Sequence, residues 1–177
     1  FMEKKDLILD SMLELLAEKK GESCSVSEIA KKAGIAKGGM YYYFKSKEEV
    51  FDALVERTYQ NIIDDCQNIA SSSGENAIEK LKHLYIHYRS SIISSDLDAY
   101  LHKPQNAGIH QKSLAKILTS LSPIVAQIIE QGNEEKVFHC TYPLELSETI
   151  ISVFCFLLDP GIFNWTPKQI ERKLTVI

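Results

Sequence analysis

Apolar residues recur every three or four positions along most of this chain, and no stretch alternates convincingly between apolar and polar residues. Recurrence at this spacing places apolar side chains on one face of an α-helix, whereas strict alternation is typical of a β-strand. The helical stripes begin at Ile8 and continue to Leu174, and clusters of Gly, Pro and Ser separate them. The pattern therefore predicts an all-α fold.

The N-terminal segment has clear helix boundaries. A first amphipathic helix is expected over about 3–19, and Gly21 is expected to end it. Ser25 and Glu28 have the spacing of a capping box, in which each side chain bonds a backbone N–H that the helix start leaves without a partner. The helix that they open is expected to end at Gly34, because glycine is favoured just after a helix.

The same signature recurs further along the chain. Ser46 and Glu49 predict a second capping box, and a single long helix is expected over about 46–70. A short element at 37–44 lies between the two boxes. Two short helices joined by a tight glycine turn form a helix–turn–helix, whose second helix enters the major groove of DNA.

We therefore expect a three-helix, helix–turn–helix DNA-binding head at 1–47, which the long helix links to a larger helical body at 48–177. Pro123 is expected either to kink a body helix or to start a new one, and Gly132 to close that helix. Thr166 is expected to cap the last helix. The body helices are expected at about 77–92, 112–131, 143–158 and 167–177, with short helices joined by loops at 97–111.

Positive charge is concentrated in the head, although the whole chain has a net charge of −4. Residues 1–47 hold nine lysines and seven acidic residues, whereas 48–177 hold eleven basic and seventeen acidic residues. Within 31–47 there are five lysines and no acidic residue. This cluster is a candidate phosphate-binding patch, and an ordinary solvated lysine face is the alternative.

The segment from Ile8 to about Leu54 closely resembles the head of the TetR family of bacterial regulators. The resemblance is carried by Ser25-Val26-x-x-Ile29-Ala30-x-x-Ala33-Gly34-Ile35, Lys37-Gly38, Tyr41-Tyr42-Tyr43-Phe44 and Lys45-Ser46-Lys47-Glu48-Glu49. It implies a repressor that binds a palindromic DNA operator as a homodimer and is released by a small-molecule ligand. The DNA contacts that we expect come from Ser25, Ser27, Lys37, Gly38, Gly39, Tyr41, Tyr43 and Lys47.

Small residues and tyrosines suit a recognition helix. Gly38 and Gly39 let the backbone approach phosphate, and a tyrosine can bond phosphate or contact a thymine methyl group. Tyr42 or Phe44 is expected in the core, because consecutive residues on a helix cannot all face outward. Gly39 and Ala36 stand where members of the family usually carry Ser or Thr, so a hydroxyl–phosphate contact is missing.

The body is expected to bind the small molecule between its helices, where aromatic side chains with polar groups are a common lining. The residues that we expect at this pocket are Tyr85, Tyr88, Tyr100, His102, His110 and Phe138. His83 and His87 share a helix face at a spacing that could hold a metal, but no neighbouring carboxylate or cysteine in the sequence completes a site. We therefore expect no metal and no cofactor.

By the same resemblance, the helices at about 143–158 and 167–177 are expected to pair with their copies in a homodimer, as a four-helix bundle. Their apolar content fits such packing, and packing within one chain is the alternative.

Composition excludes several other classes. The four cysteines are widely separated and include no C-x-x-C pair, which favours a reducing cytoplasm over a disulfide framework or a zinc site. The longest apolar run, 150–158, is too short to span a bilayer. No nucleophile elbow, P-loop or dinucleotide motif is present, so a helical enzyme is the weaker alternative. A non-specific DNA-binding protein or an activator is another.

Overall fold

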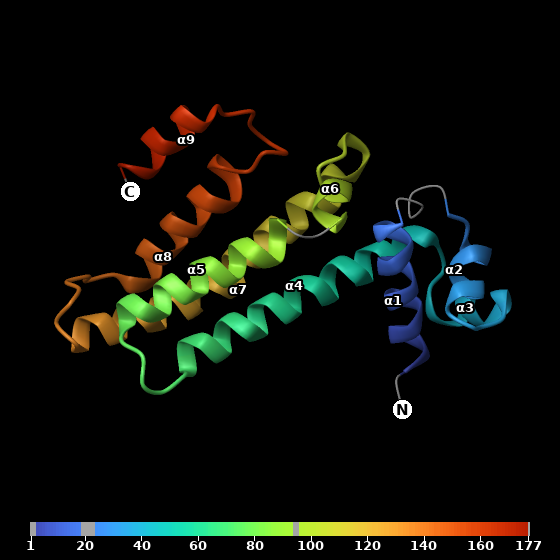
Figure 1. The fold of residues 1–177 in the computed structure, drawn as a ribbon, viewed down its shortest axis with the longest axis horizontal. Helices are drawn as coiled ribbons and strands as arrows, with labels where there is room; N and C mark the ends of the chain where they lie inside the picture. The colour runs from blue at the N-terminus through green and yellow to red at the C-terminus, as the bar shows by residue number, and fades with distance from the viewer. Residues whose placement is uncertain (1–2, 19–23, 94–95, 177) are drawn as a thin grey trace. The chain divides into compact units, whose positions relative to one another are not determined.

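The computed structural model describes residues 3–18, 24–93 and 96–176, and every regular element within these ranges is helical (Figure 1). The predicted all-α fold is confirmed. The elements are α1 (Lys4–Ala17), α2 (Val26–Lys32), α3 (Lys37–Tyr43), α4 (Lys47–Ser71), α5 (Ala77–Ile93), α6 (Asp96–Leu101), the 3₁₀ turn η1 (Pro104–Asn106), α7 (Ala107–Glu134), α8 (Pro143–Ser152), the π-helical segment η2 (Val153–Leu157) and α9 (Pro167–Leu174).

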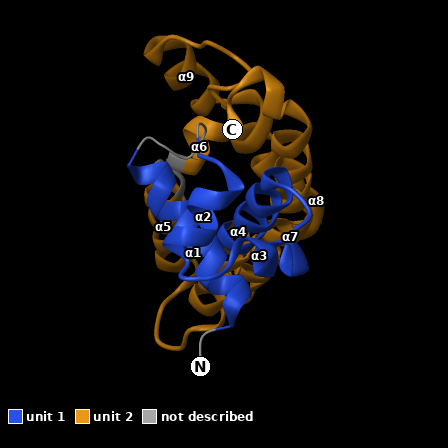
Figure 2. Cartoon of the chain, turned by 90° about the vertical axis from the view of Figure 1, so that its right-hand side faces the viewer, with its two compact units in different colours: residues 1–58 blue, residues 59–177 orange. Residues whose placement is uncertain are grey.

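The chain divides into two compact units, residues 1–58 and 59–177 (Figure 2). The first unit contains the start of α4 as well as the expected head. Arg57 of α4 bonds Asp10 of α1 at 2.7 Å and lies 3.6 Å from Asp6, so this part of α4 is tied to the first helix.

The core of the first unit forms where α2 packs against α1 and α3. Ile8, Met12, Ile29, Met40 and Leu54 are fully buried there. Burying side chains of this size contributes about 1.5–3 kcal/mol each, so the short helices α2 and α3 owe their stability mainly to packing rather than to their own length.

Capping fixes the ends of α2 as predicted. The Ser25 hydroxyl accepts from the Glu28 N–H at 3.3 Å, and the Glu28 carboxylate accepts from the Ser25 N–H at 2.7 Å. Gly34 follows the helix with φ of +67°, a left-handed conformation that glycine adopts without steric cost.

The second capping box is only half formed. The Ser46 hydroxyl accepts from the Glu49 N–H at 3.2 Å as expected, but the Glu49 carboxylate accepts from the N–H of Lys45, at 2.6 Å. The carboxylate thus reaches the residue before the cap. The long helix still begins and ends within one residue of the predicted range.

The second unit is organised around α7, which packs against α5 and α8. Its inner face carries buried residues such as Ile117, Leu121 and Ile128. Within the described residues, Pro104–Glu134 is the one helix long and apolar enough to cross a membrane, and 56% of its most apolar window is buried in the protein. Such burial is typical of a core helix.

α7 continues through Pro123, so the expectation of a new helix start there is wrong. Proline lacks an N–H, and the carbonyl of Thr119 loses its usual helical partner. Buried residues on both sides, Leu121 and Ile124, hold this stretch in the core. Packing therefore outweighs the local cost of the proline.

The end of α7 also differs from the prediction. The helix passes Gly132 and ends at Glu134, and Lys136 then takes the left-handed conformation with φ of +59°. Gly132 has another role, because a Cβ at this position would collide with the ring of Phe138. The helix ends expected at Gly21 and at 94–95 lie outside the described residues.

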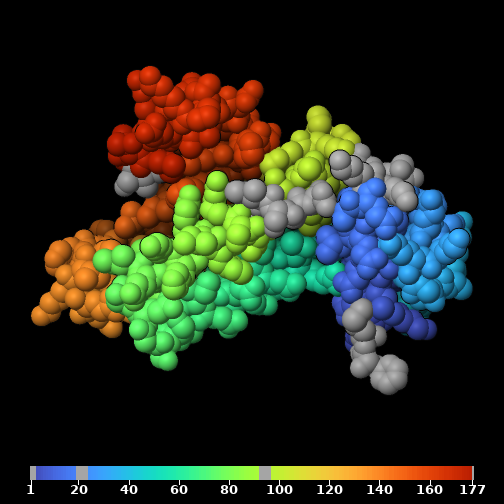
Figure 3. Space-filling model, viewed as in Figure 1, coloured from blue at the N-terminus to red at the C-terminus, as the bar shows by residue number. Residues whose placement is uncertain are grey.

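The last elements form the C-terminal part of the second unit. α8 gives way to η2 before 158, and α9 is a short helix with no buried residue among those described. Thr166 caps α9 through a complete box with Gln169, as predicted. Figure 3 shows the side chains of this segment at the surface of its unit.

Candidate functional site

One face of α3 exposes two aromatic side chains. Tyr41 is 49% exposed and Tyr42 83%, while Met40 between the helix and the core is fully buried. Gly38 lies one turn earlier on the same face and is also exposed. Exposed tyrosines beside bare backbone are the combination that a DNA recognition helix needs.

The expectation that Tyr42 or Phe44 packs in the core holds for Phe44 alone, which is 5% exposed. Phe44 follows the end of α3 in an extended conformation, and this change of direction turns its ring inward. Tyr42 instead points outward, and its ring meets that of Tyr43 edge to face at 5.1 Å between centroids. Tyr42 is therefore a candidate contact residue that helical spacing did not identify.

Gly38 and Gly39 both leave open space beside the α3 backbone. A Cβ built at either position meets no other atom within 4 Å. Neither glycine is needed for packing of the described residues, although a glycine inside a helix costs about 1 kcal/mol relative to alanine. An explanation for the pair must therefore lie outside the chain's own packing.

The lysine cluster is less uniform than its sequence suggests. Lys32 pairs with Glu18 at 2.8 Å and Glu14 at 3.0 Å, so acidic groups of the first helix offset its charge. Lys47 begins α4, next to the Ser46 cap. The exposed residues that remain from the expected DNA-binding set are Ser25, Ser27, Lys37, Gly38, Gly39 and Tyr41, while Tyr43 and Lys47 are half-buried.

The second unit contains two cavities that share one wall. The first has a volume of about 200 Å³ and is almost wholly apolar. The second, of about 130 Å³, is lined by polar and charged groups. The shared wall consists of Tyr88, Arg89, Phe154 and Cys155.

The expected pocket residues divide between these cavities. Tyr88 lines both, Tyr85 lines the apolar cavity, and His102 and His110 line the polar one. Neither cavity is lined by Tyr100 or by Phe138, whose ring covers Gly132. The sequence thus indicates the right region of the body without separating lining residues from their neighbours.

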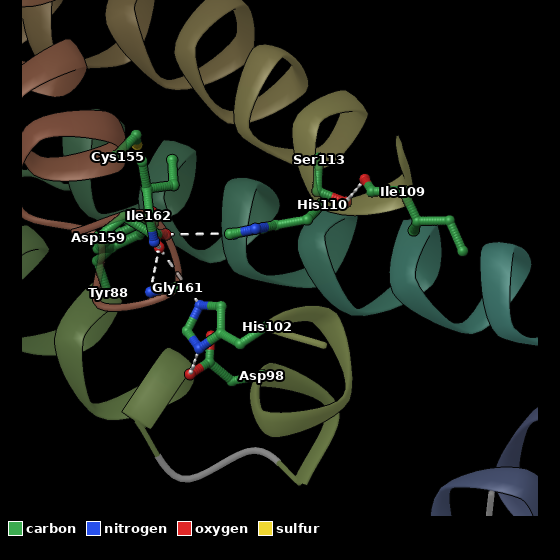
Figure 4. A network of polar contacts seen from close by, with 10 residues as sticks. All are labelled: Tyr88, Asp98, His102, Ile109, His110, Ser113, Cys155, Asp159, Gly161 and Ile162. Carbon is green, nitrogen blue, oxygen red and sulfur yellow. Dashed lines mark hydrogen bonds and ion pairs between the residues drawn. The ribbon is translucent and has the colours of Figure 1, made fainter. Parts of the chain in front are cut away.

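The polar cavity contains a buried His–Asp–His cluster (Figure 4). Asp159 Oδ2 lies 3.2 Å from Nε2 of His110, and its Oδ1 lies 3.5 Å from Nε2 of His102. On its other side, His102 Nδ1 lies 3.6 Å from Asp98. The backbone N–H of Gly161 donates to Asp159 at 2.7 Å and fixes the carboxylate.

Charge and burial act in opposite directions on this cluster. Burial alone would raise the pKa of Asp159, but the hydrogen bond and charge of His110, the Gly161 N–H and the charge of His102 together lower it. Burial raises the pKa of Asp98 despite the lowering effect of His102. The arrangement holds an ionised carboxylate between two imidazoles.

Sequence reasoning did not identify Asp159 or Asp98 as site residues. Both lie far from one another and from His110 along the chain, so no local spacing marks them. Asp159 stands in an Asp-Pro-Gly sequence that reads as an ordinary turn. Only the packing of α6, α7 and η2 brings the group together.

Comparison with known proteins covers both units. Residues 8–54 match the sequence profile of "Bacterial regulatory proteins, tetR family", and residues 91–177 match "Tetracyclin repressor-like, C-terminal domain". The two matches together extend over most of the chain.

Curated relatives share the N-terminal half. The HTH-type transcriptional regulator YuxN of Bacillus subtilis (strain 168) is 33% identical over 94 residues, 53% of this chain and 32% of its own. The HTH-type transcriptional regulator AcrR of Shigella flexneri is 30% identical over 95 residues, 53% of this chain and 44% of its own. The matched segment thus spans less than half the length of either relative.

Solved structures share the fold over a longer range. A TetR/AcrR-family regulator from Thermobifida fusca YX-ER1 superposes with a TM-score of 0.66 at 21% identity, covering 97% of this chain and 94% of its own. A transcriptional regulator from Cytophaga hutchinsonii ATCC 33406 gives 0.64 at 27% identity, covering 84% and 76%. With a helix–turn–helix head, an exposed recognition helix and profile matches in both units, this chain belongs to the TetR family of bacterial regulatory proteins.

Proposed function

We propose that this protein is a transcriptional repressor that binds a palindromic DNA operator as a homodimer and releases it when a small molecule binds the body. The observation that carries the proposal is the exposed face of α3, with Tyr41, Tyr42 and Gly38, inside the segment that matches the tetR profile. Phosphate contacts come from Lys37, Lys47 and the start of α4, where backbone N–H groups favour an anion.

Dimerisation is proposed through α8 and α9. Exposed apolar side chains on these elements support it, among them Leu144 and Leu146 of α8 and Leu174 of α9. A homodimer of two-fold symmetry presents two recognition helices to half-sites about one helical turn apart, or slightly more. The operator is therefore expected to be palindromic.

The effector is proposed to be an amphipathic small molecule. Each body cavity is smaller than the roughly 300–1,000 Å³ of a typical ligand pocket, so binding is expected to displace the Phe154 side chain and join the two. An apolar group then fills the space near Leu84 and Val125, and a polar group reaches His102. FadR from Bacillus subtilis, a structural neighbour at 24% identity and a TM-score of 0.62, was crystallised with stearoyl-CoA, which also joins an apolar chain to a polar group.

We propose no catalytic activity for this chain, and its place of action as the bacterial cytoplasm. The alternatives are a helical enzyme, a non-specific DNA-binding protein and an activator. A footprint confined to one palindrome distinguishes a specific regulator from a non-specific binder, and transcription in vitro from that site gives the sign of regulation.

The experiment starts from the DNA that flanks the gene. Labelled fragments are titrated with the protein at fixed salt, and a footprint is mapped on any fragment that binds. Fatty acids, acyl-CoA thioesters and aromatic compounds are then added to the complex. We expect one protected palindrome and its release by a compound that also binds the free protein. Protection of every fragment alike would contradict the proposal.

A further inference from the structure

Two histidines and an aspartate converge in the polar cavity from three separate segments. His102 follows α6, His110 lies in α7 and Asp159 follows η2. One potential ligand atom of each lies within 4.8 Å of those of the others, and Figure 4 shows both imidazole rings directed at the same carboxylate. His110 and Asp159 are each 8% exposed. Two imidazoles and one carboxylate are a ligand set found in catalytic zinc sites and in non-haem iron sites.

We propose that His102, His110 and Asp159 bind one divalent transition-metal ion. Metal–ligand bonds of about 2.0–2.2 Å in a tetrahedral site place neighbouring ligand atoms roughly 3.3 Å apart. The Asp159 oxygens lie 3.5 Å from Nε2 of His102 and 3.2 Å from Nε2 of His110. The carboxylate thus already has the required separation from both imidazoles, and rotation of the two rings toward each other completes the site.

The groups around these ligands resemble the outer shell of a metal site. A metal-bound histidine usually donates its other ring N–H to a carboxylate, and Asp98 lies 3.6 Å from Nδ1 of His102. The N–H groups of Gly161 and Ile162 donate to Oδ1 of Asp159 at 2.7 and 3.1 Å. These contacts orient one imidazole and the carboxylate before any metal binds.

Gly161 makes room for this arrangement. A Cβ at this position would collide with the imidazole of His102. The backbone here has no left-handed conformation that would by itself require glycine. The close approach of the ring to the backbone is therefore the structural reason for glycine at 161.

Charge favours a divalent cation of the transition series. With neutral imidazoles, the carboxylates of Asp98 and Asp159 give the cluster two negative charges, which a divalent ion balances. Imidazole ligands select zinc, iron, cobalt or nickel over calcium and magnesium. Three protein ligands leave a coordination position for water or for a donor atom of a small molecule in the cavity of about 130 Å³.

The chain provides its own comparison in His83 and His87 of α5. His83 lies 3.0 Å from Glu75 and His87 lies 3.3 Å from Asp65, so each pairs with a different carboxylate. The two histidines do not form part of a three-ligand group among the described residues. The double variant His83→Ala/His87→Ala is therefore a matched control.

The test uses the full chain, freed of metal with a chelator, and needs no DNA. Co²⁺ is titrated while its visible absorption is followed, and Zn²⁺ is then titrated in competition with a coloured chelator. We expect one ion per chain in the wild type and in the His83→Ala/His87→Ala control. We expect loss of that binding in His110→Ala and in Asp159→Asn, whose amide can still accept from the Gly161 N–H.

Two milder variants keep the test decisive if those proteins fail to fold. Asp98→Asn is expected to weaken Zn²⁺ binding about 10–100-fold, and Gly161→Ala to weaken it by displacing His102. Circular dichroism and melting of the metal-free proteins establish that each variant is folded. No ion bound by the wild type, or equal affinity in folded site variants and the control, would overturn the proposal. Because DNA is absent, failure here leaves the proposed repressor function untouched.

Discussion

The backbone N–H of Ala77, the first residue of α5, donates to the side chain of Glu135 just beyond the end of α7, at 2.9 Å. The other carboxylate oxygen of Glu135 accepts from the Gln131 amide at 2.6 Å. Glu135 thus caps a helix other than its own and joins two helices of the body. We expect Glu135→Ala to lower the melting temperature, while Glu135→Gln, which can still accept from Ala77, loses less.

This capping contact has a predictable pH dependence. The hydrogen bonds from the Ala77 N–H and the Gln131 amide lower the pKa of Glu135. A lowered folded-state pKa means that the contribution is complete above the unfolded value of about 4.3 and is lost as the pH falls through the lower folded value. The melting difference between wild type and Glu135→Ala should therefore be constant near neutral pH and shrink only in acid. A difference that grows in acid would contradict this role.

The buried thiols should resist alkylation in the native protein. Burial raises the pKa of Cys66 and of Cys155 to about 11 each, and only the thiolate is a good nucleophile. Cys140 is half-buried. At pH 7.5 we expect iodoacetamide to modify Cys140 at least tenfold faster than Cys66 or Cys155, as measured by mass spectrometry of peptides. Equal rates in the folded protein would show that the body interior is open to reagent.

Helix caps were predictable because their signals are local. Ser25 with Glu28, and Thr166 with Gln169, each lie within one helical turn, and both boxes form as expected. The residues that failed depend on contacts beyond that range. Pro123 stays inside a helix because core packing holds it, and Tyr42 faces outward because α3 ends before Phe44.

The body site lies at the limit of what sequence can indicate. The aromatic and histidine content suggested a pocket containing Tyr88, His102 and His110, and these residues do line cavities. Asp159 gave no signal, because its closeness to both histidines depends on how separate elements pack. Local patterns therefore predict which elements form but not which distant residues meet.

The two glycines of α3 should respond differently to substitution. Both have space for a side chain, and alanine in a helix is favoured over glycine by about 1 kcal/mol. We expect Gly38→Ala to raise the melting temperature but weaken operator binding, because a methyl group there keeps the backbone from phosphate. Gly39→Thr should keep or improve binding by adding a hydroxyl. Normal binding by Gly38→Ala together with no binding by Gly39→Thr would show that α3 meets DNA with another face.

The dimer proposal predicts which exposed apolar residues matter. Leu144 and Leu174 are 43% and 40% exposed, and Ile78 of α5 is 54% exposed. We expect the double variant Leu144→Glu/Leu174→Glu to sediment as a monomer with weakened operator binding, because it places charges in an apolar interface. Ile78→Glu is the matched control and should remain a dimer. Dimers of the double variant would place the interface elsewhere.

The central claim, that α3 and the start of α4 bind DNA, is tested most directly by operator affinity as a function of salt. Each phosphate contact contributes about one unit to the slope of log affinity against log salt. Lys47→Ala should therefore reduce the slope by about one on operator and shuffled DNA alike, and Tyr41→Phe should weaken operator binding alone. Lys32→Ala is the control, because Glu14 and Glu18 already offset its charge, and it should keep the wild-type slope. Wild-type affinity and slope in both Lys47→Ala and Tyr41→Phe would contradict the account.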